Sequence, residues 1–413
     1  MVVMAGSVRA QEADGLLADV VTNAGYNFTI ELNHSAAPRT VSHFMRLASG
    51  DQPWMDHATG NVVTGVPYYV GSKFQKFASQ SGPSRIYLQA GEKKDLLGTE
   101  GPGYVLRDEI RRYNNGSGNL ILPHSAYTVT MANTGPHSSG GQFIITLIND
   151  PQFDDKNSAF GTVRQLHYTY NSQGQVTGLS NGRVAVDNIY SSNAQVTISS
   201  ITFRRRGVAA NGFDETQHWG ELPSMCKVPI TSVEHTPTEA ILHHPSQVGG
   251  VYRSYASIDL LNWFYAPSFD VYHGPGVGAS APMPLSHGGS TRGFYRLTGV
   301  LYPVTTVPQN LYGKTITVGL GTPYAIRFEF GVNGINAAYY RYSDASVGVL
   351  DYEYTVTGPY SAELHVTSPG LDEATYTLYF GGKNLAVSTN ETMGALIHYP
   401  GFSVIDSHFT MLP

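Results

Sequence analysis

Apolar and polar residues alternate along much of the chain, which is the pattern of strands that bury one face. The clearest early example follows an Asn-Ala-Gly turn at 23–25, and its apolar positions are Tyr26, Phe28, Ile30 and Leu32. Residues 19–22, before the turn, contain two valines. We therefore expect two strands joined by a tight turn near the start of the chain.

Helical periodicity occurs at two places. After Pro38, apolar residues recur at the i, i+3, i+4 and i+7 positions of one helix face, and they are Val41, Phe44, Met45 and Ala48. Pro38 suits the first turn of a helix, and Gly50 suits its end. A second helix is expected over Arg183–Ser191, before a strand whose apolar positions are Val196, Ile198, Ile201 and Phe203.

The helical pattern stops after Gly207, and the rest of the chain divides by composition. Residues 207–229 are polar and contain proline, so we interpret them as a linker. Residues 230–303 alternate short strands with loops and are interpreted as a β-sandwich-like domain. In residues 304–413 the strands are longer, which predicts an antiparallel β domain, either a sandwich or a barrel. Its expected strands cover 324–330, 338–342, 350–356 and 375–380.

The composition indicates a mainly β protein. Charged residues make up only 14%, against roughly 25% in an average soluble protein, while Gly 45, Tyr 27 and Pro 23 are abundant. A length of 413 residues suggests two or three domains. The net charge of −6 disfavours a nucleic-acid partner, since phosphate binding needs a basic surface. No apolar stretch is long enough for a transmembrane segment, and the single cysteine, Cys226, cannot form an internal disulfide.

The first residues bear on the compartment of the protein. Residues 1–16 are interpreted as a truncated signal peptide or a tail, because Val8 and Ala10 have the spacing of a signal-peptidase site after a short apolar run. The alternative is a frayed tail of a cytosolic protein. Low charge and abundant Tyr, Thr, Ser and Gly favour export. We therefore expect an exported bacterial protein, either periplasmic, on the cell surface or extracellular.

Residues 129–146 read as a strand, a Gly- and Ser-rich loop and a second strand, and they include Met-Ala-Asn-x-Gly-Pro followed by Gln-Phe. This segment resembles the core of the cyclophilin-type peptidyl-prolyl isomerases. Residues 17–206 carry further landmarks in the order of that family, namely 28–32, 37–41, 68–74, Asp108-Glu109 and 159–163. The resemblance implies a mainly β fold, an eight-stranded antiparallel barrel with two helices. Residues 252–263 and 293–297 resemble β-sandwich modules of secreted bacterial proteins, so we expect β-rich accessory domains of that type after the barrel.

The activity implied by this resemblance is cis–trans isomerisation of X–Pro bonds in extended or unfolded polypeptide. Rotation about such a bond crosses a barrier of about 18–20 kcal/mol, and no covalent bond breaks. Neither a nucleophile nor a cofactor or metal is therefore required. Catalysis needs an apolar pocket for the proline ring, polar groups that hold the flanking peptide, and a cation near the imide nitrogen. The cation acts mainly on the twisted transition state, so it affects the rate.

The family pattern implies a polar cradle with an altered cation and pocket. Gln89 and Gln142 take the places of two substrate-positioning glutamines. The main chain of Ala132 and Asn133 takes the place of the clamp on the substrate. Where the family has an essential arginine this sequence has Lys76, which keeps the charge and loses the planar fork of donors. The expected pocket residues, with isoleucines in place of two phenylalanines and an asparagine in place of a histidine, are Ile86, Ile144, Phe153 and Asn157.

These departures leave two interpretations of the site. In the first, the domain is a slow isomerase in which Lys76 supplies the cation. In the second, it is a non-catalytic binding or scaffold module of a secreted surface protein, which holds proline-containing segments without turnover. A pocket closed by residues 78–85 would favour the second, and an open groove beside Asn133 and Gln142 would favour the first.

The C-terminal half offers fewer indications. Its strands are rich in tyrosine, which indicates either ordinary sheet packing or a face that binds carbohydrate or peptide. We expect proline-containing polypeptide segments as partners of the first domain, and a cell-surface or matrix partner for the C-terminal domains. Asp108-Glu109 could suggest an acid–base pair, but neighbouring residues on a strand point to opposite faces, so we expect a carboxylate that braces a loop.

Overall fold

The computed structural model describes most of the chain. The residues described are 12–78, 85–92, 101–110, 120–134, 137–154, 156–237, 239–245, 250–265, 271–273, 281–286, 293–302, 307–319, 325–332, 334, 337–358, 360–383, 392–398, 400 and 405–412. Most of the N-terminal interval that we interpreted as a signal peptide or tail lies outside them. None of the helices in these ranges is long and apolar enough to cross a membrane.

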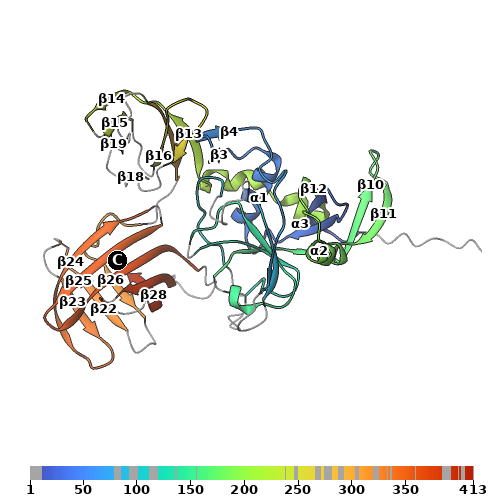
Figure 1. Cartoon of the computed structure of the whole chain (residues 1–413). Helices are drawn as coiled ribbons and strands as arrows, with labels where there is room; N and C mark the ends of the chain where they lie inside the picture. Colours follow the sequence, from blue (N-terminus) through green and yellow to red (C-terminus); the bar gives the residue numbers. More distant parts are fainter. Residues whose placement is uncertain are drawn as a thin grey trace, which may run out of the picture.

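The N-terminal part is built on one eight-stranded antiparallel sheet, in the order β12-β1-β2-β9-β7-β8-β6-β5. The sheet curves around a core covered by two helices, so the expected mainly β fold is confirmed (Figure 1). Its strands are β1 (Gly15–Thr22), β2 (Phe28–Leu32), β5 (Gln75–Ala78), β6 (Ile86–Ala90), β7 (Thr128–Met131), β8 (Phe143–Thr146), β9 (Ala159–Val163) and β12 (Ile198–Arg206).

The two edges of this sheet approach each other just ahead of β5 and β12. An isolated bridge pairs Lys73 with Thr197, and the main-chain N–H of Phe74 donates to the carbonyl of Val196 at 2.9 Å. The N–H of Ile198 donates to the carbonyl of Ser72, also at 2.9 Å. These bonds draw the sheet into a barrel-like shape without a continuous β5–β12 ladder.

Both predicted helices are present, as α1 (Pro38–Ser49) and α2 (Gly182–Ser191). The N-terminus of α1 is satisfied by Glu109, whose Oε2 accepts the N–H of Thr40 at 2.9 Å and its hydroxyl at 3.0 Å. This contact fills an otherwise unpaired helix donor. The neighbouring residue Asp108 braces a loop, as expected for a carboxylate in that pair, because its Oδ2 accepts the N–H of His137 at 2.8 Å. The helix ends at Gly50, which has a φ of 89°. A side chain there would meet the main chain of Val66 at 2.8 Å, so only glycine fits this position.

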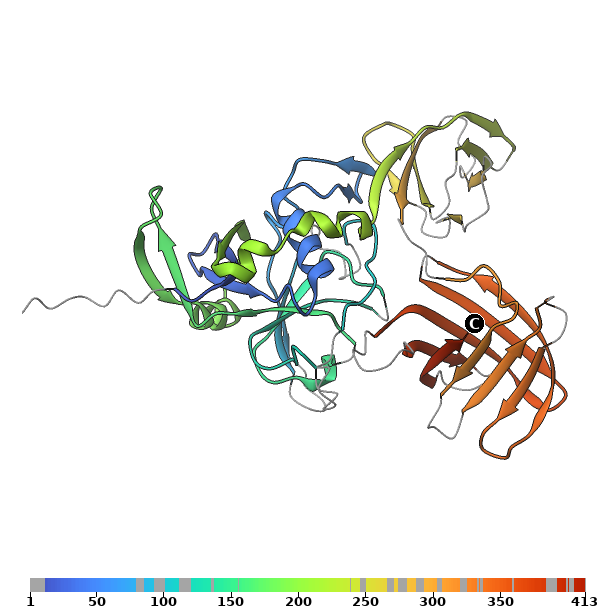
Figure 2. The ribbon, with the colours of Figure 1, turned by 180° about the vertical axis from the view of Figure 1, so that it is seen from behind.

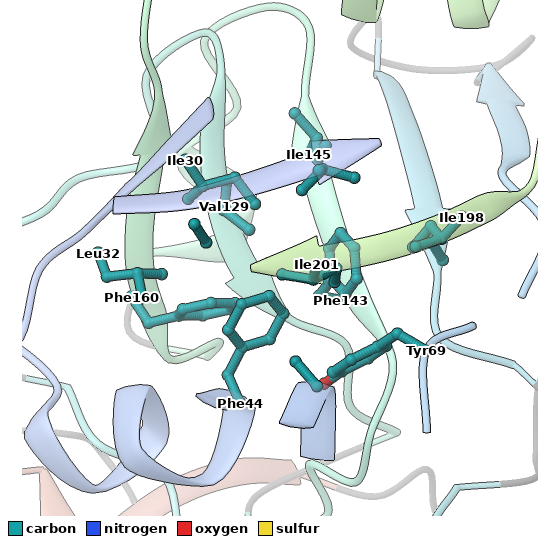
Figure 3. Packing of buried hydrophobic residues seen from close by; sticks show 14 of the residues in the cluster. Ile30, Leu32, Phe44, Tyr69, Val129, Phe143, Ile145, Phe160, Ile198 and Ile201 are labelled. Atoms are coloured by element: carbon teal, nitrogen blue, oxygen red, sulfur yellow. The ribbon is translucent and has the colours of Figure 1, made fainter. Parts of the chain in front are cut away.

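The hydrophobic core lies between α1 and the concave side of the sheet. Phe44 of α1 stands at its centre, with ring centroids 5.1 Å from Tyr69, 5.1 Å from Phe160 and 5.8 Å from Phe143 (Figure 3). These four rings are all almost completely buried. Burying one such ring contributes roughly 1.5–3 kcal/mol to stability. The apolar face predicted for the helix is therefore the face that packs on the sheet.

Two short β elements extend from the main sheet. The hairpin of β10 (Leu166–Tyr170) and β11 (Val176–Asn181) projects away from the rest of the N-terminal part in both views (Figures 1 and 2). The pair of β3 (Trp54–Asp56) and β4 (Asn61–Val63) lies on another side, next to the following domain.

The interval 207–229, for which we expected a linker, contains regular structure. It holds α3 (Gly207–Gly212), the 3-10 helix η2 (Glu215–Glu221) and β13 (Ser224–Val228). Helix η2 packs on α1, where the guanidinium of Arg46 lies 4.4 Å from the ring of Trp219 and the hydroxyl of Ser42 donates to the carbonyl of Glu215 at 2.9 Å. This interval is therefore joined to the first domain by specific contacts.

Two further β units follow. The first combines β13 with β20 (Phe294–Leu301), β16 (Gly250–Ser257), β17 (Phe264–Tyr265) and β18 (Val271–His273), and a three-stranded sheet of β14 (Ser232–His235), β15 (Glu239–His244) and β19 (Ala281–Ser286). The second is a closed antiparallel barrel (Figure 2). Its strands are β21 (Thr315–Val318), β22 (Ile326–Phe330), β23 (Ala337–Arg341), β24 (Val347–Val356), β25 (Ser361–Ser368), β26 (Leu371–Lys383), β27 (Thr392–His398) and β28 (Ile405–Leu412).

Most of the described tyrosines on the barrel strands serve sheet packing. Tyr339 and Tyr376 are buried in the barrel core, and Tyr352 and Tyr354 pack against it. Tyr342, which directly follows β23, is exposed, at 41%. The arrangement follows the alternation of strand side chains between two faces.

A cluster that we call the aromatic seam joins the N-terminal part to the later units. Its buried members are Met55, Tyr104, Met225, Tyr255, Val300, Tyr302 and Tyr360. The hydroxyl of Tyr255 donates to the sulfur of Met55 at 3.3 Å, and the main-chain N–H of Val105 donates to the hydroxyl of Tyr302 at 3.2 Å. Tyr360, just before β25 of the C-terminal barrel, packs edge-on against Tyr302. The seam thus brings all three β units into contact.

Candidate functional site

The pairing register defines a convex, outer face of the sheet on β5, β6 and β8. Gln75 lies opposite Gln89, Phe77 lies opposite Tyr87, and Gln89 lies opposite Ile144 on the other side. Residues opposite each other in a ladder project to the same face, so these five side chains share one surface. We call it the outer face. The neighbours that alternate with them, including Leu88 and Ile145, are fully buried in the core on the other side.

The two predicted positioning glutamines are brought together on this face. The side-chain amide of Gln89 donates to the side-chain carbonyl of Gln142. The main-chain N–H of Ala132 donates to the main-chain carbonyl of Gln142 at 2.9 Å. Gln142 is 6% exposed, so its side of this hydrogen bond is shielded from water. Three of the predicted residues therefore form one connected polar group.

Asn133 adds an open edge of main chain to this group. It follows the end of β7, and its side-chain amide donates to the carbonyl of Lys156 at 2.6 Å. Asn157 supports the same strand end, because its amide donates to the carbonyl of Met131 at 2.8 Å. The main-chain N–H and C=O of Asn133 have no hydrogen-bond partner among the described residues. They are suited to pair with an incoming extended peptide.

Aromatic side chains form the apolar part of the outer face. Phe153, in the 3-10 helix η1 (Pro151–Phe153), is 7% exposed and meets the ring of Tyr87 edge-on at 5.5 Å. The ring of Phe77 stacks on that of Tyr87 at 4.9 Å. Ile144, the predicted pocket residue on β8, is 4% exposed. Burial raises the pKa of Tyr87, so its hydroxyl stays neutral over the ordinary pH range.

Ile86 is placed differently from Phe153 and Ile144. It lies opposite Ala78 in the ladder, and alternation along β6 puts its side chain on the face of Leu88, away from Tyr87 and Gln89. Tyr87 therefore occupies the place beside Phe153 that the sequence analysis gave to its neighbour.

Lys76 lies at the edge of the sheet, apart from the glutamine pair. It is opposite Leu88 in the ladder, it is exposed, and its ammonium donates to the carbonyl of Ser192, the residue after α2. Gln75 is the β5 residue that faces Gln89, and its amide donates to Glu92. A lysine held by one carbonyl on a flexible stem can exchange that partner for another at small cost.

Arg85 is a cation on the outer face itself. Alternation places it with Tyr87 and Gln89, and its guanidinium lies 4.3 Å from the ring centroid of Phe153. Its Nε donates to Oδ2 of Asp150 at 2.9 Å, which forms an ion pair. This pair was not anticipated from the sequence, although the spacing 85, 87, 89 was a signal that these residues share a face.

Residues 79–84, which fall within the interval that could close the pocket, lie outside the described residues, as do Gly135 and Pro136 of the loop before Gln142. In the described ranges, no group of three or more His, Cys, Asp or Glu side chains gathers to hold a metal ion. The described outer face combines hydrogen-bonding amides, an open main-chain edge, apolar rings and nearby cations. Such a surface can hold an extended peptide and contact an apolar side chain within it.

Comparison with known proteins places this geometry in context. A sequence model of the family "Cyclophilin type peptidyl-prolyl cis-trans isomerase/CLD" matches residues 17–194. Peptidyl-prolyl cis-trans isomerase B of Streptomyces anulatus is 32% identical over 151 residues, which cover 37% of this chain and 78% of that protein. Peptidyl-prolyl cis-trans isomerase A of Mycobacterium tuberculosis is 30% identical over 187 residues, 45% of this chain and 90% of that protein.

Two solved structures of a cyclophilin type peptidyl-prolyl cis-trans isomerase from Cryptosporidium parvum are also similar. The first has 18% sequence identity and a TM-score of 0.32, and the match covers 47% of this chain and 100% of that one. The second was obtained in the presence of the dipeptide Ala-Pro and has 19% identity, a TM-score of 0.32, and coverage of 46% and 99%.

Proposed function

Since the chain belongs to the family of cyclophilin-type peptidyl-prolyl cis-trans isomerases, we propose that its first domain, residues 17–206, isomerises X–Pro bonds in extended or unfolded polypeptide. The observation that carries this proposal is the open main-chain edge of Asn133 beside the hydrogen-bonded pair of Gln89 and Gln142. A peptide that pairs with this edge would lie across the glutamines. Its proline ring would then reach the apolar side of the outer face.

In this arrangement each group has a distinct role. The main chain of Ala132 and Asn133 clamps the segment, and Gln89 and Gln142 orient the peptide group that precedes proline. Phe153, Ile144 and Tyr87 receive the proline ring, with Asn157 bracing the strand end beside them and Ile86 supporting β6 from its other face. Holding the peptide at both ends favours the twisted state, in which the C–N bond loses its double-bond character.

Lys76 is the proposed cation for the imide nitrogen. As the bond twists, the nitrogen regains its lone pair and can accept a hydrogen bond, so a donor there lowers the barrier selectively. The pairing of Lys76 with Leu88 puts its side chain on the opposite face of β5 from Gln89, so the ammonium has to leave the carbonyl of Ser192 and pass around the sheet edge to reach the nitrogen. It also offers a point charge in place of a planar fork. We therefore propose that turnover is slow.

The test is the cis–trans exchange rate of an Ala-Pro peptide, measured by NMR exchange spectroscopy with the full chain. Lys76→Ala should lower the acceleration about tenfold or more, and Lys76→Arg should retain or increase it. Lys227→Ala is the matched control, since Lys227 is another exposed strand lysine, on β13 and away from the outer face. If neither the wild type nor Lys76→Arg accelerates exchange, the catalytic proposal fails.

The second candidate is a non-catalytic binding or scaffold module of a surface protein. It is favoured by one observation, the position of the Lys76 ammonium on Ser192 rather than beside the glutamine pair. Under this alternative, proline-containing peptides bind the outer face without any change in their exchange rate. Chemical-shift titration of the same peptide, together with the exchange measurement, separates the two.

We also propose that the protein is exported and that the later β units localise it at a cell surface or matrix. Support comes from the low charge of 14% and from the contacts of the aromatic seam, which hold those units against the first domain. Fractionation of the producing cells checks this proposal. Recovery of the full chain from the cytosol alone would contradict it.

A further inference from the structure

Two aromatic rings and one carboxylate hold the side chain of Arg85 on the outer face. Its guanidinium lies over the ring of Phe153 at 4.3 Å and near that of Tyr87 at 5.8 Å. Its Nε is bonded to Asp150, whose side chain is 4% exposed. Asp150 is fixed in turn, because its main-chain N–H donates to the carbonyl of His124 at 2.9 Å and its Oδ1 accepts the N–H of Gln152 at 3.2 Å. The orientation of the guanidinium is therefore set by stacking and by a rigid carboxylate.

This anchoring uses only one of the three guanidinium nitrogens. The two terminal nitrogens of Arg85 have no hydrogen-bond partner among the described residues, and the side chain is 30% exposed. Two parallel N–H groups on a planar fork match the two oxygens of a carboxylate. Because the fork is already oriented, little side-chain entropy would be lost when a carboxylate binds.

The guanidinium of Arg85 lies beside the residues that are proposed to receive the proline ring. Arg85 directly precedes β6, two residues before Tyr87 and four before Gln89, and alternation at about 3.3 Å per residue puts the three side chains on one face. Phe153 contacts both the guanidinium and the ring of Tyr87. A side chain next to a proline bound against Phe153 would therefore come within reach of the terminal nitrogens.

We infer that Arg85 is a specificity-determining residue, which selects proline-containing segments that carry a carboxylate side chain next to the proline. This inference rests on the site given under the proposed function, and it concerns which peptides bind there. Since Asp150 balances the charge of Arg85, the preference comes from oriented donors rather than from net charge. It should therefore persist at moderate salt concentration.

The experiment compares peptides that differ at one position. Two series carry Glu, Gln or Lys either directly before or directly after proline, and their dissociation constants for the full chain are measured by chemical-shift titration. In at least one series the wild type should bind the Glu peptide about three- to tenfold more tightly than the Gln peptide, as expected for a partly exposed charged hydrogen bond. Arg85→Gln should reduce this ratio to about one.

Arg183→Gln serves as the matched control. Arg183 also stacks on an aromatic ring, that of Tyr127 at 5.0 Å, and also bonds through Nε, to the carbonyl of Val163 at 3.2 Å. It should leave the Glu-to-Gln ratio unchanged. Arg85→Lys keeps an ion pair with Asp150 while removing the fork, so it gives an intermediate ratio even if Arg85→Gln is poorly folded.

Equal binding of the Glu and Gln peptides by the wild type in both series overturns the inference, as does a ratio that survives in Arg85→Gln. Exchange rates measured on the same peptides report on the proposed function separately. Exchange without a Glu preference would refute the role of Arg85 and leave the isomerase standing. A Glu preference that Arg85→Gln abolishes, without exchange, would support Arg85 and refute catalysis.

Discussion

The outer face and the aromatic seam are built on neighbouring parts of the same fold, yet they use opposite kinds of contact. The outer face carries amides, cations and the partly exposed rings of Phe77 and Tyr87, and the main chain of Asn133 has no hydrogen-bond partner among the described residues. In the seam, Tyr255 is fully buried, and Met55 and Tyr104 are 1% and 3% exposed. Its described polar contacts join buried groups, such as the bond from Tyr255 to Met55 and that between Tyr104 and His43.

This difference separates two tasks. The outer face keeps hydrogen-bonding capacity for a ligand, which limits how much it can stabilise the fold. The seam commits large side chains to packing and can stabilise the arrangement of the three β units without contacting a ligand. Changes in the seam should therefore alter stability and leave the exchange rate of folded protein intact. Changes on the outer face should do the reverse.

The largest effect on stability is expected for Tyr255→Ala. This substitution removes a fully buried ring and leaves a cavity beside Met55 and Gly60, so the free energy of unfolding should fall by about 3–5 kcal/mol. Urea unfolding measures the loss. Tyr255→Phe is the control, since it removes only the hydroxyl bonded to Met55 and should cost about 1 kcal/mol or less. A loss of exchange activity in folded Tyr255→Ala would contradict the separation.

The free energy of unfolding should depend on pH because of His43, which lies next to the seam. This histidine is fully buried, its Nε2 lies 3.0 Å from the hydroxyl of Tyr104, and burial lowers its pKa to about 3. The unfolded chain binds a proton near pH 6.5, whereas the folded chain does so only near 3, so stability is lost as the pH falls between these values. The expected loss is about 1.4 kcal/mol per pH unit.

Urea unfolding at pH 7 and at pH 4.5 measures this dependence. His43→Gln can keep a hydrogen bond to Tyr104 and cannot titrate, so the acid-induced loss should be smaller in this variant by about 2–3 kcal/mol. An identical loss in the variant and in the wild type would show that other groups account for the acid sensitivity.

An intermediate effect is expected for Phe153→Leu, because Phe153 is both buried and part of the outer face. The change nearly conserves volume, so stability should fall by less than about 1.5 kcal/mol. It also removes the ring on which the Arg85 guanidinium lies, so binding of the Glu peptide should weaken more than binding of the Gln peptide. Titration of both peptides checks this prediction, and an equal weakening of the two would contradict it.

The smallest effect on stability is expected for Lys76→Ala. Lys76 is exposed on the edge strand β5, and its described side-chain bond goes to the carbonyl of Ser192. The free energy of unfolding should change by no more than about 0.5 kcal/mol. Urea unfolding measures this change. A loss above about 2 kcal/mol would mean that Lys76 stabilises the fold and is not available as the cation for the imide nitrogen.

The helices and strands of the first domain could be predicted well, because the sequence patterns that indicate them are local. Helix α1 has an apolar stripe, a proline at its start and Gly50 at its end, and these determine its bounds. The proximity of Gln89 and Gln142 followed from the resemblance, since no local pattern joins residues that are 53 positions apart.

The face on which a strand residue lies was harder to predict. A shift of one residue moves a side chain to the other face, and residues 79–85 separate β5 from β6. For this reason Tyr87 and Arg85 were missed, while Ile86 and Lys76 were placed with the outer face. The seam was inaccessible for another reason, since its contacts, such as Tyr255 with Met55, join residues 200 positions apart.

The central claim is that the outer face is the isomerase site, and the exchange rate of a proline peptide with a double variant tests it most directly. Gln89→Leu combined with Gln142→Leu removes both amides of the hydrogen-bonded pair together, so neither is left unpaired. We predict that the wild type accelerates exchange and that the double variant loses this acceleration at least tenfold, while Tyr255→Phe retains it. A double variant that folds and catalyses as well as the wild type would contradict the account.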